Sequence, residues 1–214
     1  MFGFNKKEIP FVICWDLDET LGDFRALEKG SDAVKIREGM QGVLEAARQK
    51  GIRQVVTTSA TRDYAEKGLG ILGIREYFDE IFPFEKVAGY LGKKYKPVLE
   101  HYKLTEKEAG EKLIVVGDSI RDRPLDISGL TALIECDTAA NAENIGHAIA
   151  KLTSNGSLKT SYNKLFAEAR QTPEGYKVIE KVFKGECALT QGKYDNDGKE
   201  IELNLIMFLK KTKE

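Results

Sequence analysis

The sequence predicts an α/β fold in which a parallel sheet carries helices on both of its faces. Short apolar runs rich in β-branched residues, such as residues 9–15 (IPFVICW) and 112–116 (KLIVV), have the composition of strands buried on both sides. Segments with helical periodicity alternate with these runs, which is typical of parallel βαβ units. Polar side chains follow the ends of the runs. Together these observations predict a Rossmann-like, three-layer core and, after it, a C-terminal α+β extension with a hairpin.

The first half of the chain supplies three strands and two helices to this prediction. A strand over residues 9–15 comes first. A helix is expected over residues 40–50, because its apolar residues recur at helical spacing and Gly51 follows as a C-terminal stop. The next elements are a strand over 52–56, a helix over 63–72 and a short strand over 77–82.

The second half of the core continues the alternation of strand and helix. A helix is expected over residues 97–102, where Pro97 fits the first turn. Two strands and a longer helix complete the core, over residues 112–116, 130–136 and 139–152.

The alternation weakens after residue 152, and this sets the predicted domain boundary. We expect residues 1–152 to form the core and residues 153–214 to form an extension that does not fold independently. The extension should hold a helix over residues 161–170 and a β-hairpin over residues 186–210, whose turn is the DNDG segment at 195–198. An isolated hairpin is marginal in water. It must therefore pack on the core, extend a sheet edge or join a second subunit, which leaves a homo-oligomer open.

Composition limits the classes of partner. The 214 residues include 33 Lys and Arg against 34 Asp and Glu, so no nucleic-acid surface is expected. No apolar run approaches the roughly 20 residues that span a bilayer, and none resembles a signal peptide. Cys14, Cys136 and Cys187 lack metal-binding spacing and fit reduced thiols. These observations predict a soluble, cytoplasmic protein without structural zinc or a membrane partner.

Polar residues gather where the predicted strands end. Asp16 and Asp18 follow the first strand, Thr57 follows the second, and Asp118 follows a later one. In parallel sheets, ligands bind beyond the carboxyl ends of the strands. Carboxylates this close repel each other unless a cation intervenes, and Mg²⁺ prefers oxygen ligands. A lone Asp-x-Asp is more often a solvated loop or a helix cap, but the matching strand-end residues favour a metal site here.

These residues carry a resemblance to a known family. Residues 16–20 (DLDET) resemble the first motif of the haloacid dehalogenase-like (HAD) hydrolases, Asp-x-Asp-x-Thr after a strand. Thr57, which closes a strand, is similar to the second motif. Residues 117–122 (GDSIRD) resemble the fourth motif, Gly-Asp-x-x-x-Asp. Order and spacing agree as well, and the resemblance covers roughly residues 8–150.

The resemblance implies roles for the aspartates. Asp16 would attack phosphorus and form an aspartyl-phosphate. Asp18 would act as general acid and then as general base. Asp16, the backbone carbonyl of Asp18, and Asp118 would hold Mg²⁺. Asp122 would support the metal or its waters, although an exposed aspartate at a helix start is an alternative.

Phosphate binding would fall to the second and third motifs. The resemblance implies that the Thr57 hydroxyl, helped by the Thr58 amide, donates to phosphate. The third motif is a lysine, for which Lys93, Lys94 and Lys96 are candidates, and each could equally be a solvated surface residue. In many relatives this lysine starts a helix with apolar residues five, six and nine positions later. From Lys93 these positions are occupied by Val98, Leu99 and Tyr102. We therefore choose Lys93, with Lys94 second.

Segment lengths indicate which kind of HAD protein this is. Residues 20–41 leave room only for a short flap or hairpin, and residues 57–93 are filled by a helix and a short strand. The chain thus resembles capless or minimally capped phosphatases, whose open sites admit large substrates. Residues 15–20 (WDLDET) also resemble first motifs of carboxy-terminal-domain phosphatases and eyes-absent tyrosine phosphatases, which adds a phosphoprotein substrate to the candidates.

The function implied by the resemblance is Mg²⁺-dependent hydrolysis of a phosphomonoester. The substrate would be a phosphorylated small molecule or a phosphoprotein. A phosphotransferase or phosphomutase is an alternative enzyme, and a non-catalytic HAD-fold binding or scaffold module is an alternative of another class. Asp18 argues against dehalogenase chemistry, and the intact set of Asp16, Asp18, Thr57 and Asp118 argues against the module. Neither His101 nor His147 has an evident partner, and we assign them no role.

Overall fold

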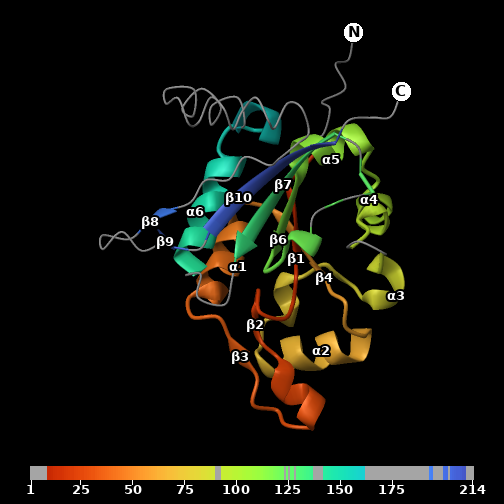
Figure 1. Ribbon diagram of the computed structural model, residues 1–214, viewed down its shortest axis with the longest axis vertical. Coiled ribbons are helices and arrows are strands. Elements are labelled where there is room, and N and C mark those ends of the chain that lie inside the picture. The colour runs from red at the N-terminus through yellow and green to blue at the C-terminus, as the bar shows by residue number, and fades with distance from the viewer. Residues whose placement is uncertain are drawn as a thin grey trace.

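Six strands build the central sheet of the protein, in the order β10-β7-β6-β1-β4-β5 (Figure 1). The computed structural model describes residues 9–89, 93–122, 124, 126–127, 129–136, 142–161, 193–194, 200–201 and 203–210. The strands are β1 (Val12–Trp15), β4 (Arg53–Thr57), β5 (Glu80–Phe82), β6 (Leu113–Gly117), β7 (Gly129–Cys136) and β10 (Leu203–Lys210). The first five run parallel, and β10 pairs antiparallel with β7. This confirms the predicted α/β fold.

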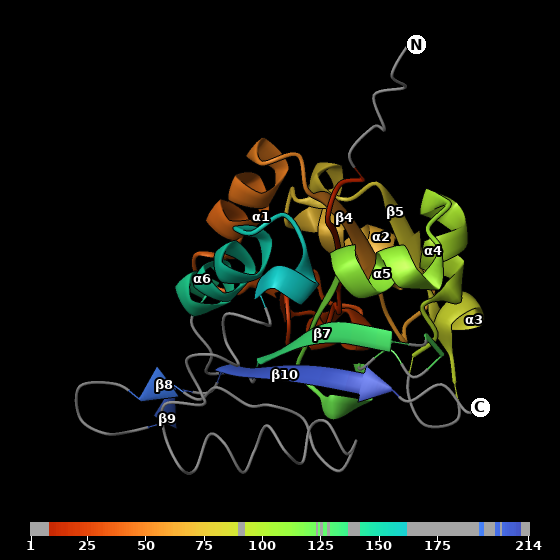
Figure 2. The same ribbon diagram turned by 90° about the horizontal axis from the view of Figure 1, so that it is seen from above.

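The helices cover both faces of the sheet. They are α1 (Met40–Gln49), α2 (Arg62–Ile71), α3 (Phe84–Val87), α4 (Lys96–Tyr102), α5 (Glu106–Lys112) and α6 (Ala142–Thr153). Buried residues of α1, α2 and α6 pack on one face of the sheet, and those of α3, α4 and α5 pack on the other. Figure 2 shows α1 and α6 on the opposite side of the sheet from α4 and α5. The molecule thus has the three layers that the alternating pattern predicts. Among the described helices, none has the length and apolar character to cross a membrane.

Strand β1 explains why the layers form where they do. Its four residues are buried, and successive side chains point to opposite faces of a strand. Ile13 and Trp15 therefore join one apolar core, while Val12 and Cys14 join the other. Because both faces need apolar residues, the strand reads as a continuous apolar run rather than as an alternating one.

A short flap follows β1. Strand β2 (Gly22–Asp23) pairs antiparallel with β3 (Lys35–Ile36), and a 3₁₀ helix over Arg25–Lys29 lies between them. A Cβ atom at Gly22 would lie 2.1 Å from the Lys35 carbonyl oxygen, so only glycine fits this crossing. The flap is the short hairpin expected from the length of residues 20–41.

The C-terminal strands extend the sheet. Strands β8 (Lys193–Tyr194) and β9 (Glu200–Ile201) pair antiparallel, in keeping with the predicted hairpin. Strand β10 then adds to the sheet edge beside β7, which is one of the three placements expected for this segment. The predicted helix over residues 161–170 lies, except for Ser161, outside the described residues. The division at residue 152 stays a prediction.

Three elements differ from the sequence prediction. The predicted strand over 77–82 is a 3₁₀ turn, Arg75–Tyr77, followed by β5 alone. Helices α3 and α5 were not predicted. Helix α5 carries a capping box, in which the Thr105 hydroxyl accepts from the Glu108 amide at 3.2 Å and the Glu108 carboxylate accepts from the Thr105 amide at 2.8 Å. That motif was the available signal, because the helix itself has little apolar periodicity.

Candidate active site

The carboxyl ends of three neighbouring strands bring the predicted site residues together. Asp16 follows β1, Thr57 ends β4, and Asp118 follows β6, and in the sheet β1 lies between the other two strands. The Asp16 amide donates to the Val116 carbonyl at 2.8 Å, which continues the β1–β6 pairing up to the site. The order of strands, rather than closeness in sequence, creates this cluster.

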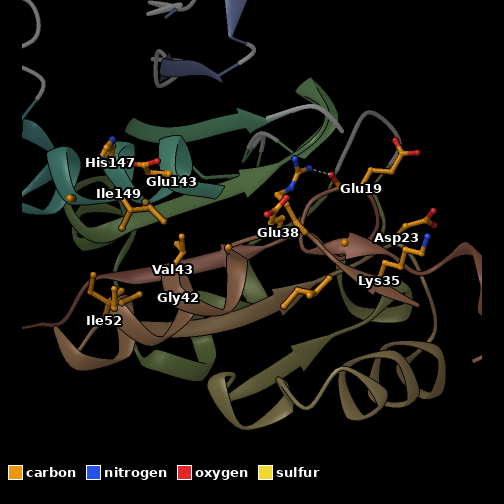
Figure 3. Close-up of a pocket in the computed structure, with 18 of the residues that line it drawn as sticks. Glu19, Asp23, Lys35, Glu38, Gly42, Val43, Ile52, Glu143, His147 and Ile149 are labelled. Carbon is orange, nitrogen blue, oxygen red and sulfur yellow. Dashed lines mark hydrogen bonds and ion pairs between the residues drawn. The ribbon is translucent and has the colours of Figure 1, made fainter. Parts of the chain in front are cut away.

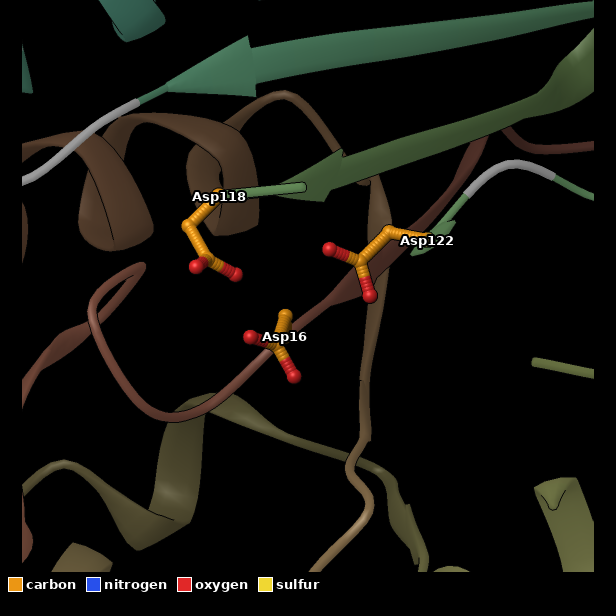
Figure 4. A group of neighbouring side chains, drawn as sticks. All are labelled: Asp16, Asp118 and Asp122. Atoms are coloured by element: carbon orange, nitrogen blue, oxygen red, sulfur yellow. The ribbon is translucent and has the colours of Figure 1, made fainter. Parts of the chain in front are cut away.

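Three aspartates form an acidic cluster, here called the Asp cluster: Asp16, Asp118 and Asp122 (Figure 4). One carboxylate oxygen from each lies within 4.8 Å of the others. Asp16 is 8% exposed and Asp122 is 3% exposed. Burial raises the pKa of all three carboxyls, and repulsion within the cluster raises them further. Ionisation of all three carboxyls is unfavourable unless a positive charge lies nearby.

Lys93 supplies part of that charge. Its Nζ contacts Asp16 Oδ1 and lies 2.7 Å from Asp122 Oδ1 and 2.8 Å from the Thr57 carbonyl oxygen. Burial alone lowers the pKa of Lys93, but Asp16 and Asp122 outweigh it and raise the pKa above its ordinary value, so the side chain stays an ammonium. The structure thus brings one of the three candidate lysines into the Asp cluster.

The other two candidate lysines lie elsewhere. Lys94 is exposed, and its amide donates to the Val87 carbonyl at 2.7 Å. Lys96 is exposed and forms an ion pair with Glu106 at 3.6 Å. Helix α4 begins at Lys96, three residues after Lys93, so the buried lysine lies in the segment that leads into the helix and not in its first turn.

Contacts around this segment fix the Lys93 backbone. The Lys93 amide donates to the Arg121 carbonyl at 3.2 Å. The buried Tyr95 hydroxyl donates to the Asp122 carbonyl, and the Asp126 carboxylate accepts from the Tyr95 amide at 2.9 Å. Asp126 therefore has a structural role, and the lysine segment is held to the fourth motif and the residues after it at several points.

Asp18 lies beside the Asp cluster but is not part of it. Its Oδ1 accepts a hydrogen bond from the Tyr64 hydroxyl at 3.0 Å. The pKa of Asp18 is raised to about 6, mainly by burial. The Tyr64 hydrogen bond opposes this rise, and the negative charges of Asp16, Glu28 and Asp23 add to it. A carboxyl with such a pKa can exchange a proton near neutral pH.

The two threonines of the second motif are both buried. The Thr57 hydroxyl has a long contact of 3.5 Å to the Trp15 carbonyl. The Thr58 amide donates to the Phe82 carbonyl at 3.0 Å, and the Thr58 hydroxyl accepts from the Ala60 amide at 3.0 Å. Because the Thr58 amide is engaged in the sheet, it is not free in this arrangement for the phosphate contact expected from the sequence.

An arginine that sequence reasoning missed holds the loop after Asp16. Arg37 Nε donates to the Thr20 carbonyl at 2.8 Å, and Nη2 donates to the Glu19 carbonyl. The Thr20 hydroxyl in turn contacts Asp16 Oδ2 at 3.4 Å. Glu19 has a φ of 59°, a left-handed conformation that favours glycine, and the Arg37 contacts help to hold the loop in it.

A cleft of about 1160 Å³ opens over the Asp cluster. Its other lining residues include Asp18, Tyr64, Phe84 and Arg121. Six carboxylate residues line the cleft against three cationic residues, so its charge is negative without a bound cation.

A second hollow, of about 1050 Å³, lies between the flap, α1 and α6 (Figure 3). None of the three Asp-cluster residues lines it. His147 at its edge is exposed and pairs with Glu143 of the same helix at 3.8 Å, while His101 packs against the rings of Phe82 and Tyr102. Both histidines thus have local partners that the sequence did not reveal, and neither lines the cleft over the Asp cluster.

The family is established by comparison with known proteins. A family model described as haloacid dehalogenase-like hydrolase matches residues 14–124, more than half of the 214 residues. This match includes the Asp cluster, Asp18, Thr57 and Lys93. The chain belongs to the haloacid dehalogenase-like hydrolase family.

Similar proteins include two that are named PpaX. The pyrophosphatase PpaX of Halalkalibacterium halodurans is 32% identical over an alignment of 106 residues, and the match covers 41% of this chain and 49% of that protein. A PpaX protein of Caldanaerobacter subterraneus subsp. tengcongensis is 35% identical over 89 residues, which are 42% of this chain and 40% of that protein. The chain thus spans less than half the length of these curated relatives.

A solved structure supports the fold. The HAD-superfamily hydrolase from Ehrlichia chaffeensis superposes with a TM-score of 0.53 at 15% identity, covering 69% of this chain and 99% of that one. At this identity the likeness concerns the fold alone.

Proposed function

We propose that this chain is a Mg²⁺-dependent phosphomonoester hydrolase that acts through an aspartyl-phosphate on Asp16. The observation that carries the proposal is the meeting of Asp16, Lys93, Asp118 and Asp122 at one sheet edge, in a chain that belongs to a hydrolase family. A buried carboxylate at the base of a cleft, next to an ammonium, suits nucleophilic attack on a phosphoryl group.

The Asp cluster fits a hard divalent cation. Its carboxylates are close, largely buried, and raised in pKa by burial and mutual repulsion, and Lys93 balances only part of their charge. Asp16, the Asp18 carbonyl and Asp118 would hold Mg²⁺, with Asp122 beside its waters, and the bound ion would neutralise charge between nucleophile and phosphate. Oxygen-only ligands favour Mg²⁺ over softer metals.

In the first half of the reaction, a carboxylate oxygen of Asp16 forms a bond to phosphorus while the bond to the leaving oxygen breaks. Asp18 gives its proton to that oxygen, which departs as an alcohol. Lys93 and the Thr57 hydroxyl bind phosphoryl oxygens, the latter in place of its long contact to Trp15.

In the second half, water attacks the aspartyl-phosphate. Asp18, now a carboxylate, takes a proton from this water, the acyl–phosphate bond breaks, and inorganic phosphate leaves. Asp16 and Asp18 return to their starting states, so the same pair of residues serves both halves.

The substrate we propose is a small phosphorylated molecule. The names of the PpaX relatives make inorganic pyrophosphate one compound to test first. The cleft is bordered by a short flap, so phosphopeptides belong in the same panel as the alternative inferred from the sequence.

The proposal is tested by assaying wild type, Asp16→Asn and Asp63→Asn on p-nitrophenyl phosphate, pyrophosphate and a phosphopeptide, with Mg²⁺ or with a chelator. Asp63 is exposed and lies outside the cleft lining, so it controls for loss of surface charge. Wild type and Asp63→Asn should turn over only with Mg²⁺, and Asp16→Asn should lose about 10³-fold or more in kcat. Full activity of Asp16→Asn would refute the nucleophile.

A further inference from the structure

Asp18 is held by a side chain that comes from a distant part of the chain. The Tyr64 hydroxyl, 46 residues away in sequence, donates to Asp18 Oδ1 at 3.0 Å, and both residues line the cleft. Among the described residues, the Asp18 carboxylate accepts one side-chain hydrogen bond, and Tyr64 donates it. The Thr20 hydroxyl of the same loop contacts Asp16 instead, at 3.4 Å.

The position of Tyr64 is fixed by the start of α2. The Thr61 hydroxyl caps this helix and accepts from the Tyr64 amide at 3.4 Å. The Tyr64 ring is partly buried and packs against the apolar core, so its hydroxyl has little freedom to move. Because α2 begins only five residues after Thr57, one short segment connects the phosphate-binding threonine at the end of β4 to this tyrosine.

We propose that Tyr64 is a positioning residue for the general-acid step: it holds Oδ1 of Asp18, so that Oδ2 carries the proton toward the leaving oxygen. The inference rests on the function proposed above. When the bond between phosphorus and the leaving oxygen breaks, Oδ2 loses its proton to that oxygen, and the Asp18 carboxylate left behind keeps the hydrogen bond from Tyr64. No other group gains or loses a proton in this step.

This role has a consequence that a purely structural role lacks. An alkyl leaving group needs the proton from Asp18, whereas p-nitrophenolate departs without it. Loss of the Tyr64 hydroxyl should therefore lower kcat/KM for alkyl phosphates more than for p-nitrophenyl phosphate. The later hydrolysis of the aspartyl-phosphate does not enter kcat/KM once the leaving group has been released.

The test compares wild type with Tyr64→Phe and Tyr102→Phe. Tyr102→Phe is a matched control, because the Tyr102 hydroxyl also donates to an aspartate, Asp79, at 2.7 Å but outside the cleft. For each protein, kcat/KM is measured for β-glycerophosphate and for p-nitrophenyl phosphate. The ratio of kcat/KM for p-nitrophenyl phosphate to kcat/KM for β-glycerophosphate should rise about tenfold in Tyr64→Phe, which is part of the rate gain that general-acid catalysis provides. In Tyr102→Phe the same ratio should stay at the wild-type value.

The ratio is measured within one preparation, so a partly inactive Tyr64→Phe sample does not change it. An unchanged ratio in Tyr64→Phe would overturn the positioning role, whether both rates fall together or neither falls. A ratio that rises equally in Tyr102→Phe would also overturn it. If wild type hydrolyses neither ester while Mg²⁺ is present, the proposed function itself fails, and that result is distinct from the others.

Discussion

At the scale of single residues, the site contains buried charges of opposite sign, and each would destabilise the fold if its partners were absent. Asp16 and Asp122 are buried, and Lys93 touches both. Removing one member of a buried ionic group leaves the others uncompensated, which costs more than the group contributes when it is complete. The pairing explains why only Lys93, of three nearby lysines, is buried.

Replacing Lys93 by Met should remove activity while keeping the length of the side chain. We expect kcat/KM to fall by about 10²-fold or more, because the phosphoryl oxygens lose a buried cation. Lys94→Met is the matched control, since Lys94 is the exposed neighbour, and its kcat/KM should stay within about twofold of wild type. The opposite pattern would assign the site lysine to Lys94.

Asp118 should destabilise the metal-free protein and stabilise the protein when Mg²⁺ is bound. Its pKa is raised by burial and by the charge of Asp122, so its ionised form disfavours the metal-free fold. Asp118→Asn should raise the metal-free Tm by about 2–4 °C at pH 7 and abolish the Tm increase that Mg²⁺ gives wild type.

Differential scanning calorimetry with chelator and with Mg²⁺ measures both effects. Asp63→Asn, at an exposed position, should behave as wild type in both conditions. A Tm increase with Mg²⁺ that survives in Asp118→Asn would mean that the ion binds without this carboxylate.

At the scale of elements, the flap is anchored to the rest of the fold rather than hinged freely. Phe24, which directly follows β2, is fully buried. A Cβ atom at Gly68 of α2 would lie 2.4 Å from the Phe24 ring. Helix α2 also carries Tyr64, so one helix positions both the flap and Asp18.

Two glycines in α2 give opposite predictions. Gly68→Ala should destabilise the protein by about 1–3 kcal/mol, because its methyl group meets the Phe24 ring. Gly70→Ala has open space around its Cβ and should stabilise by about 0.5–1 kcal/mol, the gain of alanine over glycine in a helix. Urea unfolding of both variants measures the difference. Equal effects at the two positions would contradict the anchoring of the flap on α2.

Some elements could be predicted from sequence because their signal is local. The apolar runs of β1, β4 and β6 are buried on both faces, and such runs can be recognised as strands directly from the sequence. Helix α5 could not be found from periodicity, since Ala109 and Gly110 are its only non-charged residues. Its capping box was the remaining clue.

Contacts between distant segments were harder to predict. Lys93 could be preferred from the spacing of apolar residues after it, but Tyr64 could not be found, because its role depends on how α2 lies over the loop after β1. Likewise, nothing in the sequence of β10 decides among packing on the core, extending the sheet and joining another subunit. Its pairing with β7 is a property of the whole sheet.

At the scale of the whole molecule, strand order is what turns scattered motifs into a site. The first and fourth motifs lie about 100 residues apart in the sequence, yet β1 and β6 are neighbours in the sheet. Trp15 of β1 lies opposite Val116 of β6, so Asp16, which follows Trp15, comes close to Asp118, which lies two residues after Val116. Strand β4, the other neighbour of β1, brings Thr57 to the same edge. The chemistry we propose is therefore a consequence of topology.

The most direct test of this account is to identify the residue that carries phosphate during turnover. Wild type would be acid-quenched while hydrolysing p-nitrophenyl phosphate in Mg²⁺, reduced with borohydride and mapped by peptide mass spectrometry. We predict that the modification lies on Asp16 and is absent without Mg²⁺. A label on another residue, or rapid turnover with no label on Asp16, would contradict the account.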